Sequence, residues 1–228
     1  MTKTFYTLIA AFPMLLLLFV SGCSKSSSSP SSSNNGTVSD LVASFTNTNS
    51  TTGASTTYTY SYDGQNRLTE LQISDGTPTA TYTYGQGIVT KTQGTTTTIY
   101  TLNNAGLAAS DNQGNTYTYD GSGYMINESN PNGASTVNTV SGNNIVSTVQ
   151  TTSTGTTTTY SFTFLSNLSS LKFGLTFTGT ASVNLPQTES INGFVYPLSY
   201  SYDSHGRVQT EKIVSGATVL LRTYNYIN

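Results

Sequence analysis

Residues 62–68 read Tyr62-Asp63-Gly64-Gln65-Asn66-Arg67-Leu68, and this stretch predicts the tip of a β-hairpin. The tyrosine ends one strand, and the Asp63 side chain can accept hydrogen bonds from the backbone ahead of it, which opens a turn. Three residues later comes Asn66, a residue type that tolerates the left-handed backbone of a type I turn followed by a bulge. Leu68 then begins the next strand.

The same tip recurs along the chain and therefore indicates a repeated hairpin. The copies are Tyr119-Asp120-Gly121-Ser122-Gly123-Tyr124-Met125, Tyr202-Asp203-Ser204-His205-Gly206-Arg207-Val208 and the looser Leu102-Asn103-Asn104-Ala105-Gly106-Leu107. Two less regular tips are Tyr84-Gly85-Gln86-Gly87 and Val140-Ser141-Gly142-Asn143-Asn144-Ile145, where we expect Asn144 to be left-handed. Repeats about 17 to 22 residues apart indicate one array and not several domains.

A second set of turn signals alternates with these tips. Its members are Ser74-Asp75-Gly76, Gln93-Gly94, Asp111-Asn112-Gln113-Gly114-Asn115, Asn130-Pro131-Asn132-Gly133, Ser153-Thr154-Gly155 and Ser215-Gly216. Two alternating sets predict a chain that runs up and down between two rims. A flat sheet of so many short strands would leave one apolar face wet, so the sheet has to curve. We therefore predict an all-β fold, a long up-and-down antiparallel meander that forms a strongly curved, open or half-closed barrel.

Two stretches interrupt this rhythm. Leucines at intervals of three in residues 165–173 predict one or two helical turns under the sheet, although Ser and Asn have low helix propensity. Residues 180–197, which contain Pro186 and Pro197, predict a long connection before a final hairpin that runs from Tyr200 to Tyr226.

Tyrosines repeat with a period of two, which is the period of a β-strand with two different faces. Tyr58, Tyr60 and Tyr62 share one face, and Thr59 and Ser61 share the other. We expect the tyrosine face to be the covered one, because a tyrosine can bury its ring and keep its hydroxyl near water. Further tyrosine pairs with this spacing are Tyr82 and Tyr84, Tyr117 and Tyr119, Tyr200 and Tyr202, and Tyr224 and Tyr226.

The amino terminus predicts export and lipidation. Lys3 precedes an apolar run from Leu8 to Val20, which is too short for a comfortable membrane span and has the form of a signal peptide. The run ends in Val20-Ser21-Gly22-Cys23, which resembles the lipobox of bacterial lipoproteins. That resemblance makes Cys23 the site of acylation, for instance with palmitate, and more than one acyl chain gives stable membrane attachment.

The cysteine is followed by a Ser-rich segment, residues 24–36, that cannot bury a core and predicts a flexible tether. We therefore expect a signal peptide at 1–22, the lipidated Cys23 and tether at 23–36, and a single β-meander domain at 37–228. Ser24, in place of Asp, resembles the outer-membrane class of lipoproteins. The expected location is the cell envelope, anchored to the outer membrane, on either its periplasmic or its surface side.

Composition excludes some functions. Only 8% of the residues are charged and the net charge is −2, so the chain has no field that would gather nucleic acid. Nucleic acid is therefore not an expected partner. The one histidine, His205, lies in a turn, and Cys23 serves as the anchor, so a nucleophile and its base are missing. We expect no enzyme activity, no cofactor and no metal site.

Acidic residues have a simpler explanation than catalysis. Asp63, Asp120 and Asp203 occupy the same turn position, where each caps its own turn. A hydrolase would instead need two carboxylates facing each other across a cleft. Calcium would need oxygen ligands that converge from adjacent tips, and the chain has no Asp-x-Asp-x-Asp series. The basic residues Arg67, Arg207, Lys212 and Arg222 are expected to be solvated strand residues.

The tyrosine rows are the candidate binding residues. Aromatic faces on a rigid sheet can stack on sugar rings or on apolar peptide side chains, and the alternative is that these rings form the core. The candidates are Tyr58, Tyr60, Tyr62, Tyr117, Tyr119, Tyr200 and Tyr202.

Two resemblances add to this interpretation. Tyr200-Ser201-Tyr202-Asp203-Ser204-His205-Gly206-Arg207 resembles the YD repeat of Rhs-type proteins. The wider layout of lipobox, Ser-rich tether, Tyr-Asp tips and last Tyr-Asp hairpin resembles uncharacterised Bacteroidetes lipoprotein domains with a porin-like fold. This second resemblance covers most of residues 40–228 and implies a curved antiparallel sheet, but it implies no activity.

Three functional hypotheses follow. The favoured one is a lipid-anchored envelope protein that binds a glycan, a peptide or an envelope partner without catalysis. The second is a carrier or scaffold that cups an apolar ligand such as a lipid chain, and it predicts an apolar concave pocket. The third is a hydrolase, which facing carboxylates in a cleft would support. Tyrosines exposed on the convex side would favour the first hypothesis over the second.

Overall fold

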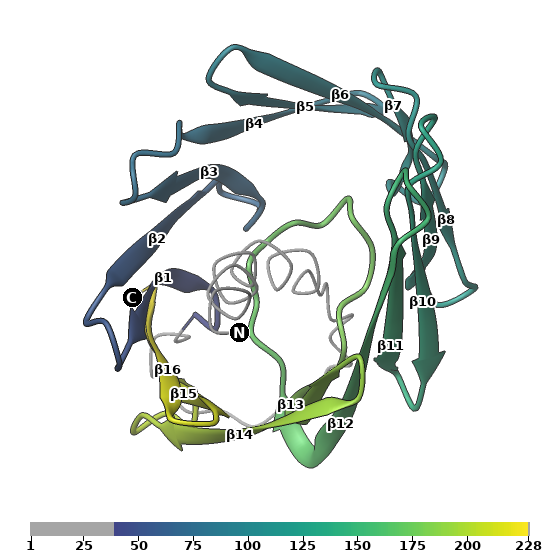
Figure 1. The fold of residues 1–228 in the computed structure, drawn as a ribbon. Helices are drawn as coiled ribbons and strands as arrows, with labels where there is room; N and C mark the ends of the chain where they lie inside the picture. Colours follow the sequence, from purple (N-terminus) through teal and green to yellow (C-terminus); the bar gives the residue numbers. More distant parts are fainter. Residues whose placement is uncertain (1–38, 228) are drawn as a thin grey trace.

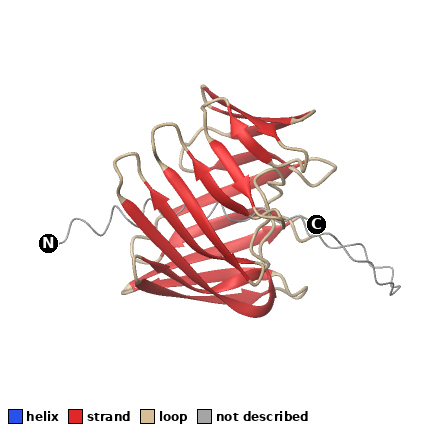
Figure 2. Ribbon diagram, turned by 90° about the vertical axis from the view of Figure 1, so that its right-hand side faces the viewer, coloured by secondary structure: helices blue, strands red, loops and turns tan. Residues whose placement is uncertain are grey.

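The computed structural model describes residues 39–227, and for residues 167–169 only the backbone. Sixteen antiparallel strands within this range form one closed barrel, in which each strand pairs with its neighbours in sequence and β1 pairs with β16 (Figure 1). Figure 2 shows the strands running obliquely between two rims of turns. No helix among the described residues is long and apolar enough to cross a membrane.

The strands are short and follow one another at close intervals. They are β1 (Val42–Asn49), β2 (Ser55–Tyr62), β3 (Leu68–Ile73), β4 (Ala80–Gly85), β5 (Ile88–Gln93), β6 (Thr96–Leu102), β7 (Ala108–Asp111), β8 (Thr116–Tyr119), β9 (Met125–Ser129), β10 (Ser135–Ser141), β11 (Asn144–Thr151), β12 (Thr157–Ser169), β13 (Asn184–Ile191), β14 (Phe194–Tyr202), β15 (Val208–Ser215) and β16 (Thr218–Tyr226).

The predicted all-β antiparallel meander is confirmed, but the barrel is closed where an open or half-closed one was expected. The first and last strands pair from Val42 opposite Tyr226 to Asn49 opposite Leu220. Closure gives hydrogen-bond partners to the backbone N–H and C=O groups of the two edge strands. An open sheet would leave these groups free to pair with other chains, which is the physical reason why closure is favoured.

The repeated tips have the predicted turn. The Asp63 carboxylate accepts hydrogen bonds from the backbone N–H groups of Gln65 and Arg67, at 2.9 and 3.0 Å. Asn66 has a φ of 62°, and the strand register shifts between Ser61 and Tyr62, as a bulge requires. The corresponding bonds form at Asn103, Asp120 and Asp203.

The expected left-handed position of Asn144 is wrong. Gly142 and Asn143 are the residues with positive φ, at 56° and 61°, whereas Ser141 pairs with Asn144. The hairpin therefore closes with a two-residue turn in which both central residues are left-handed, a geometry that glycine and asparagine favour. The two predicted rims are confirmed, because every turn of the first set follows an even-numbered strand and every turn of the second set an odd-numbered one.

The tyrosine faces point into the barrel. Tyr58 and Tyr60 are buried with Phe45 and Tyr224, whereas Thr59 and Ser61 are exposed on the outer wall. Period-two alternation therefore separates an aromatic interior from an exterior rich in threonine and serine. Exposed residues at outward positions include Thr59, Ser61, Thr81, Thr83, Ser161, Thr163, Ser199 and Thr223.

One long connection lies inside the barrel. Residues 170–183, which we call the strap, join β12 to β13 and run within the ring of strands (Figure 1). The strap accepts backbone hydrogen bonds from Val42, Leu68 and Ala108 through the carbonyls of Lys172, Gly174 and Phe177. The backbone N–H groups of Thr180 and Val183, also in the strap, donate to the carbonyls of Gly123 and Asn143. Four of the five partners lie in or next to the repeated tips, and Val42 begins β1, so the strap follows the inside of that rim.

The strap corrects two predictions. Residues 165–173 form no helical turn, because β12 continues to Ser169 and Lys172 then bridges to Leu41. Residues 180–197 are not one connection, because most of them belong to β13 and β14. Pro186 is compatible with a strand because it lies at an irregular register opposite Phe164, where no regular ladder bond is lost.

Two aromatic residues of the strap form the centres of the apolar packing. Phe173 is buried against Phe45 and Tyr60, at ring-centroid distances of 6.3 and 5.0 Å. Phe177 packs against the rings of Tyr82, Tyr84 and Tyr100 from the next section of the wall. The strap thus supplies the residues that allow inward tyrosines on β2, β4 and β6 to be buried.

Candidate functional site

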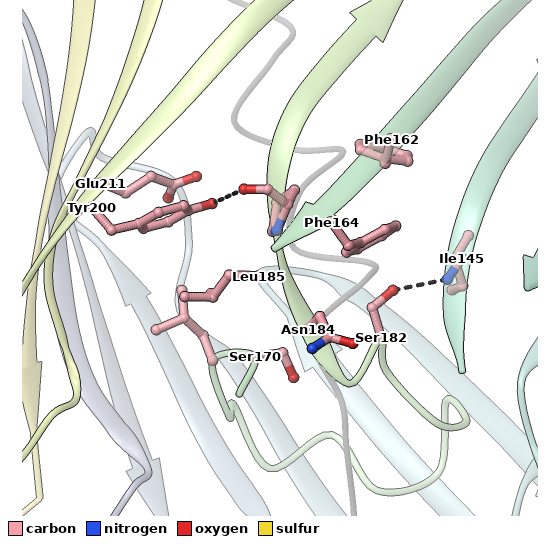
Figure 3. Close-up of a pocket in the computed structure, with 11 residues that line it drawn as sticks. Ile145, Phe162, Phe164, Ser170, Ser182, Asn184, Leu185, Tyr200 and Glu211 are labelled. Atoms are coloured by element: carbon pink, nitrogen blue, oxygen red, sulfur yellow. Dashed lines mark hydrogen bonds between the residues drawn. The ribbon is translucent and has the colours of Figure 1, made fainter. Parts of the chain in front are cut away.

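An apolar pocket lies between β11, β12, β13, β14, β15 and the strap. Its empty space is about 610 Å³, a figure that includes space open to solvent. Figure 3 shows the side chains of several of these elements surrounding this space. The apolar lining consists of Ile145, Phe162, Phe164, Leu171, Leu185 and Pro186.

Hydrogen bonds fix the polar groups around this pocket. The Tyr200 hydroxyl donates to the Pro186 carbonyl at 2.7 Å, and the Ile145 N–H donates to Ser182 Oγ at 2.9 Å (Figure 3). Asn144 and Asn184 join β11 to β13 through two further bonds, at 2.9 and 3.1 Å. These side chains bond to protein partners, which leaves the walls of the pocket mainly apolar.

A buried ionic cluster borders the pocket. Glu211, which lines it, accepts hydrogen bonds from Arg222 Nη1 at 3.0 Å and from the Tyr224 hydroxyl at 2.5 Å. Burial alone would lower the pKa of Arg222, but Glu211 outweighs burial and raises it. The expectation that Arg222 is solvated is therefore wrong, because it is only 2% exposed. The ion pair with Glu211 offsets the cost of removing the Arg222 charge from water.

Glu189 is the second carboxyl group of this cluster. Burial raises the pKa of Glu189 to about 7, Arg222 lowers it and Glu211 raises it again. Its Oε2 atom is buried and has no hydrogen-bond partner among the described residues. This buried group could not be predicted from the sequence, because neither the spacing nor the neighbours of Glu189 distinguish it from a surface glutamate.

A second cavity lies on another section of the wall, and we call it the tyrosine cavity. Its volume is about 500 Å³ including the space that opens to solvent. Its lining comes from β6 to β9 and from the strap, and includes Tyr100, Tyr117, Tyr119, Met125 and Glu128.

The candidate tyrosines are therefore distributed over several places. Tyr58, Tyr60 and Tyr62 belong to the apolar core around Phe173, and Tyr117 and Tyr119 line the tyrosine cavity. Tyr200 lines the apolar pocket. Tyr202, which is 39% exposed, borders a polar depression at the strap rim with Asp40 and Lys172. No single surface brings the seven together, and Cys23 lies outside the described residues.

The structure shows no arrangement typical of a catalytic centre around the one histidine. The His205 side chain is half exposed at a turn, and Nδ1 lies 4.0 Å from the carboxylate of Asp203. Asp203 in turn is held by Arg207, whose Nε donates to it at 2.8 Å. Among residues 39–227, no three His, Cys, Asp or Glu side chains gather in a way that could hold a metal ion.

Comparisons with known proteins show likeness in structure alone. No family model matches the chain, and no curated protein matches it in sequence. A porin-like protein from Bacteroides uniformis matches with a TM-score of 0.62 at 16% identity, over 82% of this chain and 98% of that one. A porin-like protein from Bacteroides vulgatus matches with a TM-score of 0.55 at 11% identity, with the same coverage. The porin-like fold expected from the sequence is confirmed, whereas the lipoprotein assignment and the resemblance to YD repeats stay predictions.

Proposed function

We propose that the protein is a lipid-anchored, non-catalytic component of the bacterial cell envelope whose barrel holds an apolar ligand, such as a lipid chain. The observation that carries this proposal is the apolar pocket between β11–β15 and the strap. Six apolar residues line this space, and covering them with a ligand gains about 25 cal/mol for each Å² of apolar surface buried.

The placement of the tyrosines favours this proposal over the binding of glycans on the outer wall. Stacking on a sugar needs ring faces that a polymer can reach, and the rows at Tyr58 and Tyr60 are buried inside. Many outer positions carry threonine and serine instead, and some of these pair across strands, as Thr163 does with Thr188 at 2.7 Å. A wall of this kind suits contact with water, because a lipid-facing wall is an apolar band.

The position at which the described chain enters the barrel, at residues 39–41, also supports a lipid ligand. The described chain begins at the strap rim, where Ser39 O accepts a hydrogen bond from Arg207 Nη1 and Leu41 bridges to Lys172. An acylated Cys23 and a tether with a reach of roughly 20 Å would hold this rim toward the membrane. The pocket lies beside the strap, so it would open near the lipid from which a chain could enter.

The carboxylate of Glu211 sets a preference among apolar ligands. Among the described residues it is the only acidic or basic side chain that lines the pocket, and it pairs with Arg222 at 3.0 Å. A ligand with a carboxylate head would meet a like charge there. We therefore expect an uncharged head, as in a long-chain alcohol, to bind better than a fatty-acid anion.

Photo-cross-linking of the full chain in its native envelope tests the proposal. A dodecanol analogue with a diazirine on the chain should label peptides of β12, β13 and the strap. Excess dodecanol should suppress the labelling more strongly than dodecanoate does. Leu171→Trp fills the pocket and should abolish most of the labelling, whereas Leu221→Trp, on the outer wall, should not.

The unfolding temperature of both variants verifies that they are folded. Labelling that is confined to the outer wall, or that Leu171→Trp leaves unchanged in a folded protein, would refute the pocket as the ligand site.

A further inference from the structure

We propose that the tyrosine cavity, which is separate from the apolar pocket, binds a primary ammonium group. Its strands are β6, β7, β8 and β9, whereas those of the apolar pocket are β11–β15, and different residues of the strap border each cavity. The ligand class follows from three features of the cavity: aromatic walls, a carboxylate without a cationic partner and an enclosed hydroxyl without a hydrogen bond.

The walls are the rings of three tyrosines. Tyr100 and Tyr117 lie with ring centroids 6.2 Å apart and planes inclined by 50°, and Tyr119 lies two residues along the same face of β8. The face of an aromatic ring is electronegative and attracts a cation within about 6 Å of its centre. Three rings around one space are therefore a suitable enclosure for an organic cation.

The charge of the cavity is negative. Glu128 lines it, opposite Tyr117 in the strand register, and Asp111 lies behind the wall, where it accepts a hydrogen bond from the Tyr117 hydroxyl at 2.9 Å. None of the five ion pairs among the described residues involves Glu128 or Asp111. Lys91 faces inward on β5, and burial lowers its pKa with no contribution from a carboxylate.

Burial also raises the pKa of Glu128, and Asp111 raises it further. A half-buried carboxylate with a like charge as its neighbour gains from an incoming cation. That gain is available only to a ligand that brings a positive charge into the cavity.

The hydroxyl of Tyr119 indicates which kind of cation fits. This atom is enclosed and has no hydrogen-bond partner among the described residues. The strap holds the ring from one side, since a methyl group at Gly179 would lie 2.9 Å from Tyr119 Cε1. Tyr119 and Glu128 line the same cavity. A primary ammonium carries three N–H donors, enough for a hydroxyl and a carboxylate, whereas a quaternary ammonium carries none.

Calorimetric titration of the full chain in dodecyl maltoside tests the proposal. The probe is cadaverine, a diamine, and its neutral counterpart is 1,5-pentanediol, which has the same chain length and no charge. Cadaverine should bind, and the diol should bind at least about tenfold more weakly. This comparison requires no variant, so it does not depend on how a substitution folds.

Three variants locate the site. Glu128→Gln should weaken cadaverine binding about tenfold, because it removes the charge and keeps the shape. Glu70→Gln makes the same change on β3 and should have no effect. Leu171→Trp fills the apolar pocket and should also leave cadaverine binding unchanged, so failure of the proposed lipid function and failure of this site are distinguishable.

The contrary outcomes are equally definite. The proposal is wrong if cadaverine gives no binding, if the diol binds as tightly, or if Glu128→Gln has no effect. Tetramethylammonium binding as tight as that of cadaverine would overturn the assignment to a primary ammonium, because tetramethylammonium has no N–H or O–H group to donate to Tyr119. Tyr119→Phe keeps the ring and removes only the hydroxyl, so it should weaken cadaverine binding and leave tetramethylammonium binding unchanged.

Discussion

Gly174 in the strap is the position at which one added methyl group should test the fold most directly. Its φ is +67°, and a Cβ there would lie 2.7 Å from Tyr62 Cε1 and 2.8 Å from the carbonyl oxygen of Asn66. Its own carbonyl accepts the hydrogen bond from Leu68 N at 3.0 Å, so the strap cannot move away without losing that bond.

The cost of Gly174→Ala has two sources. A left-handed backbone costs a residue with a Cβ roughly 1–2 kcal/mol. Overpacking against Tyr62 and the Asn66 carbonyl costs a further 1–3 kcal/mol, roughly, because a backbone atom cannot yield as a flexible side chain does. We therefore expect a loss of about 2–5 kcal/mol in the free energy of unfolding.

Gly53 provides the matched control. Its φ of +69° is nearly the same, and a Cβ there would meet nothing within 4 Å. Gly53→Ala should therefore lose only the backbone part, roughly 1–2 kcal/mol. Guanidinium unfolding of both variants, monitored by circular dichroism, measures the difference. Equal losses in the two variants would refute the close contact between the strap and the tip at Tyr62.

Three further predictions concern the tip, the buried acid and the anchor. Asn66→Gly should be neutral or slightly stabilising in denaturant unfolding, whereas Asn66→Val should cost about 1 kcal/mol or more, and equal stability of both with the parent would contradict the left-handed assignment. Because burial raises the pKa of Glu189 from 4.5 to about 7, the folded state binds more protons than the unfolded chain between these values. Stability should therefore fall as pH rises through this range, by roughly 3 kcal/mol, and Glu189→Gln should remove that fall; an unchanged pH profile would exclude Glu189 as its source. Cys23→Ala should abolish palmitate labelling, and continued labelling would show that the anchor lies elsewhere.

Local chemistry explains why the tips were predictable. The Asp63 and Asp203 side chains bond to backbone groups two and four residues ahead, and Asn66 occupies the left-handed position of its own turn. The error at Asn144 has the same origin. Three adjacent residues, Gly142, Asn143 and Asn144, all tolerate a left-handed backbone, so the sequence could not fix the register within that tip.

The strap shows where prediction from the sequence failed. Its bonds to Leu68, Ala108 and Gly123 join residues far apart in the chain, and no local pattern in residues 170–183 specifies these partners. The period of three in the leucines of residues 165–173 favoured a helical turn on local grounds. Burial of Phe173 and Phe177 among inward tyrosines decided the conformation instead, since tertiary packing overrides weak helix propensity.

The sequence by itself determined most of the strands, the two rims and the division into tyrosine and threonine faces, because these depend on residues two to four positions apart. Only the tertiary structure decided that β16 closes on β1, that Glu211 pairs with Arg222, and that Glu128 lies in a cavity with tyrosines from β6 and β8. The physical reason is distance along the chain. A turn is specified by its own residues. The closed barrel and the pockets depend on contacts between residues far apart in the chain, and the alternating pattern of each strand does not specify which residues meet.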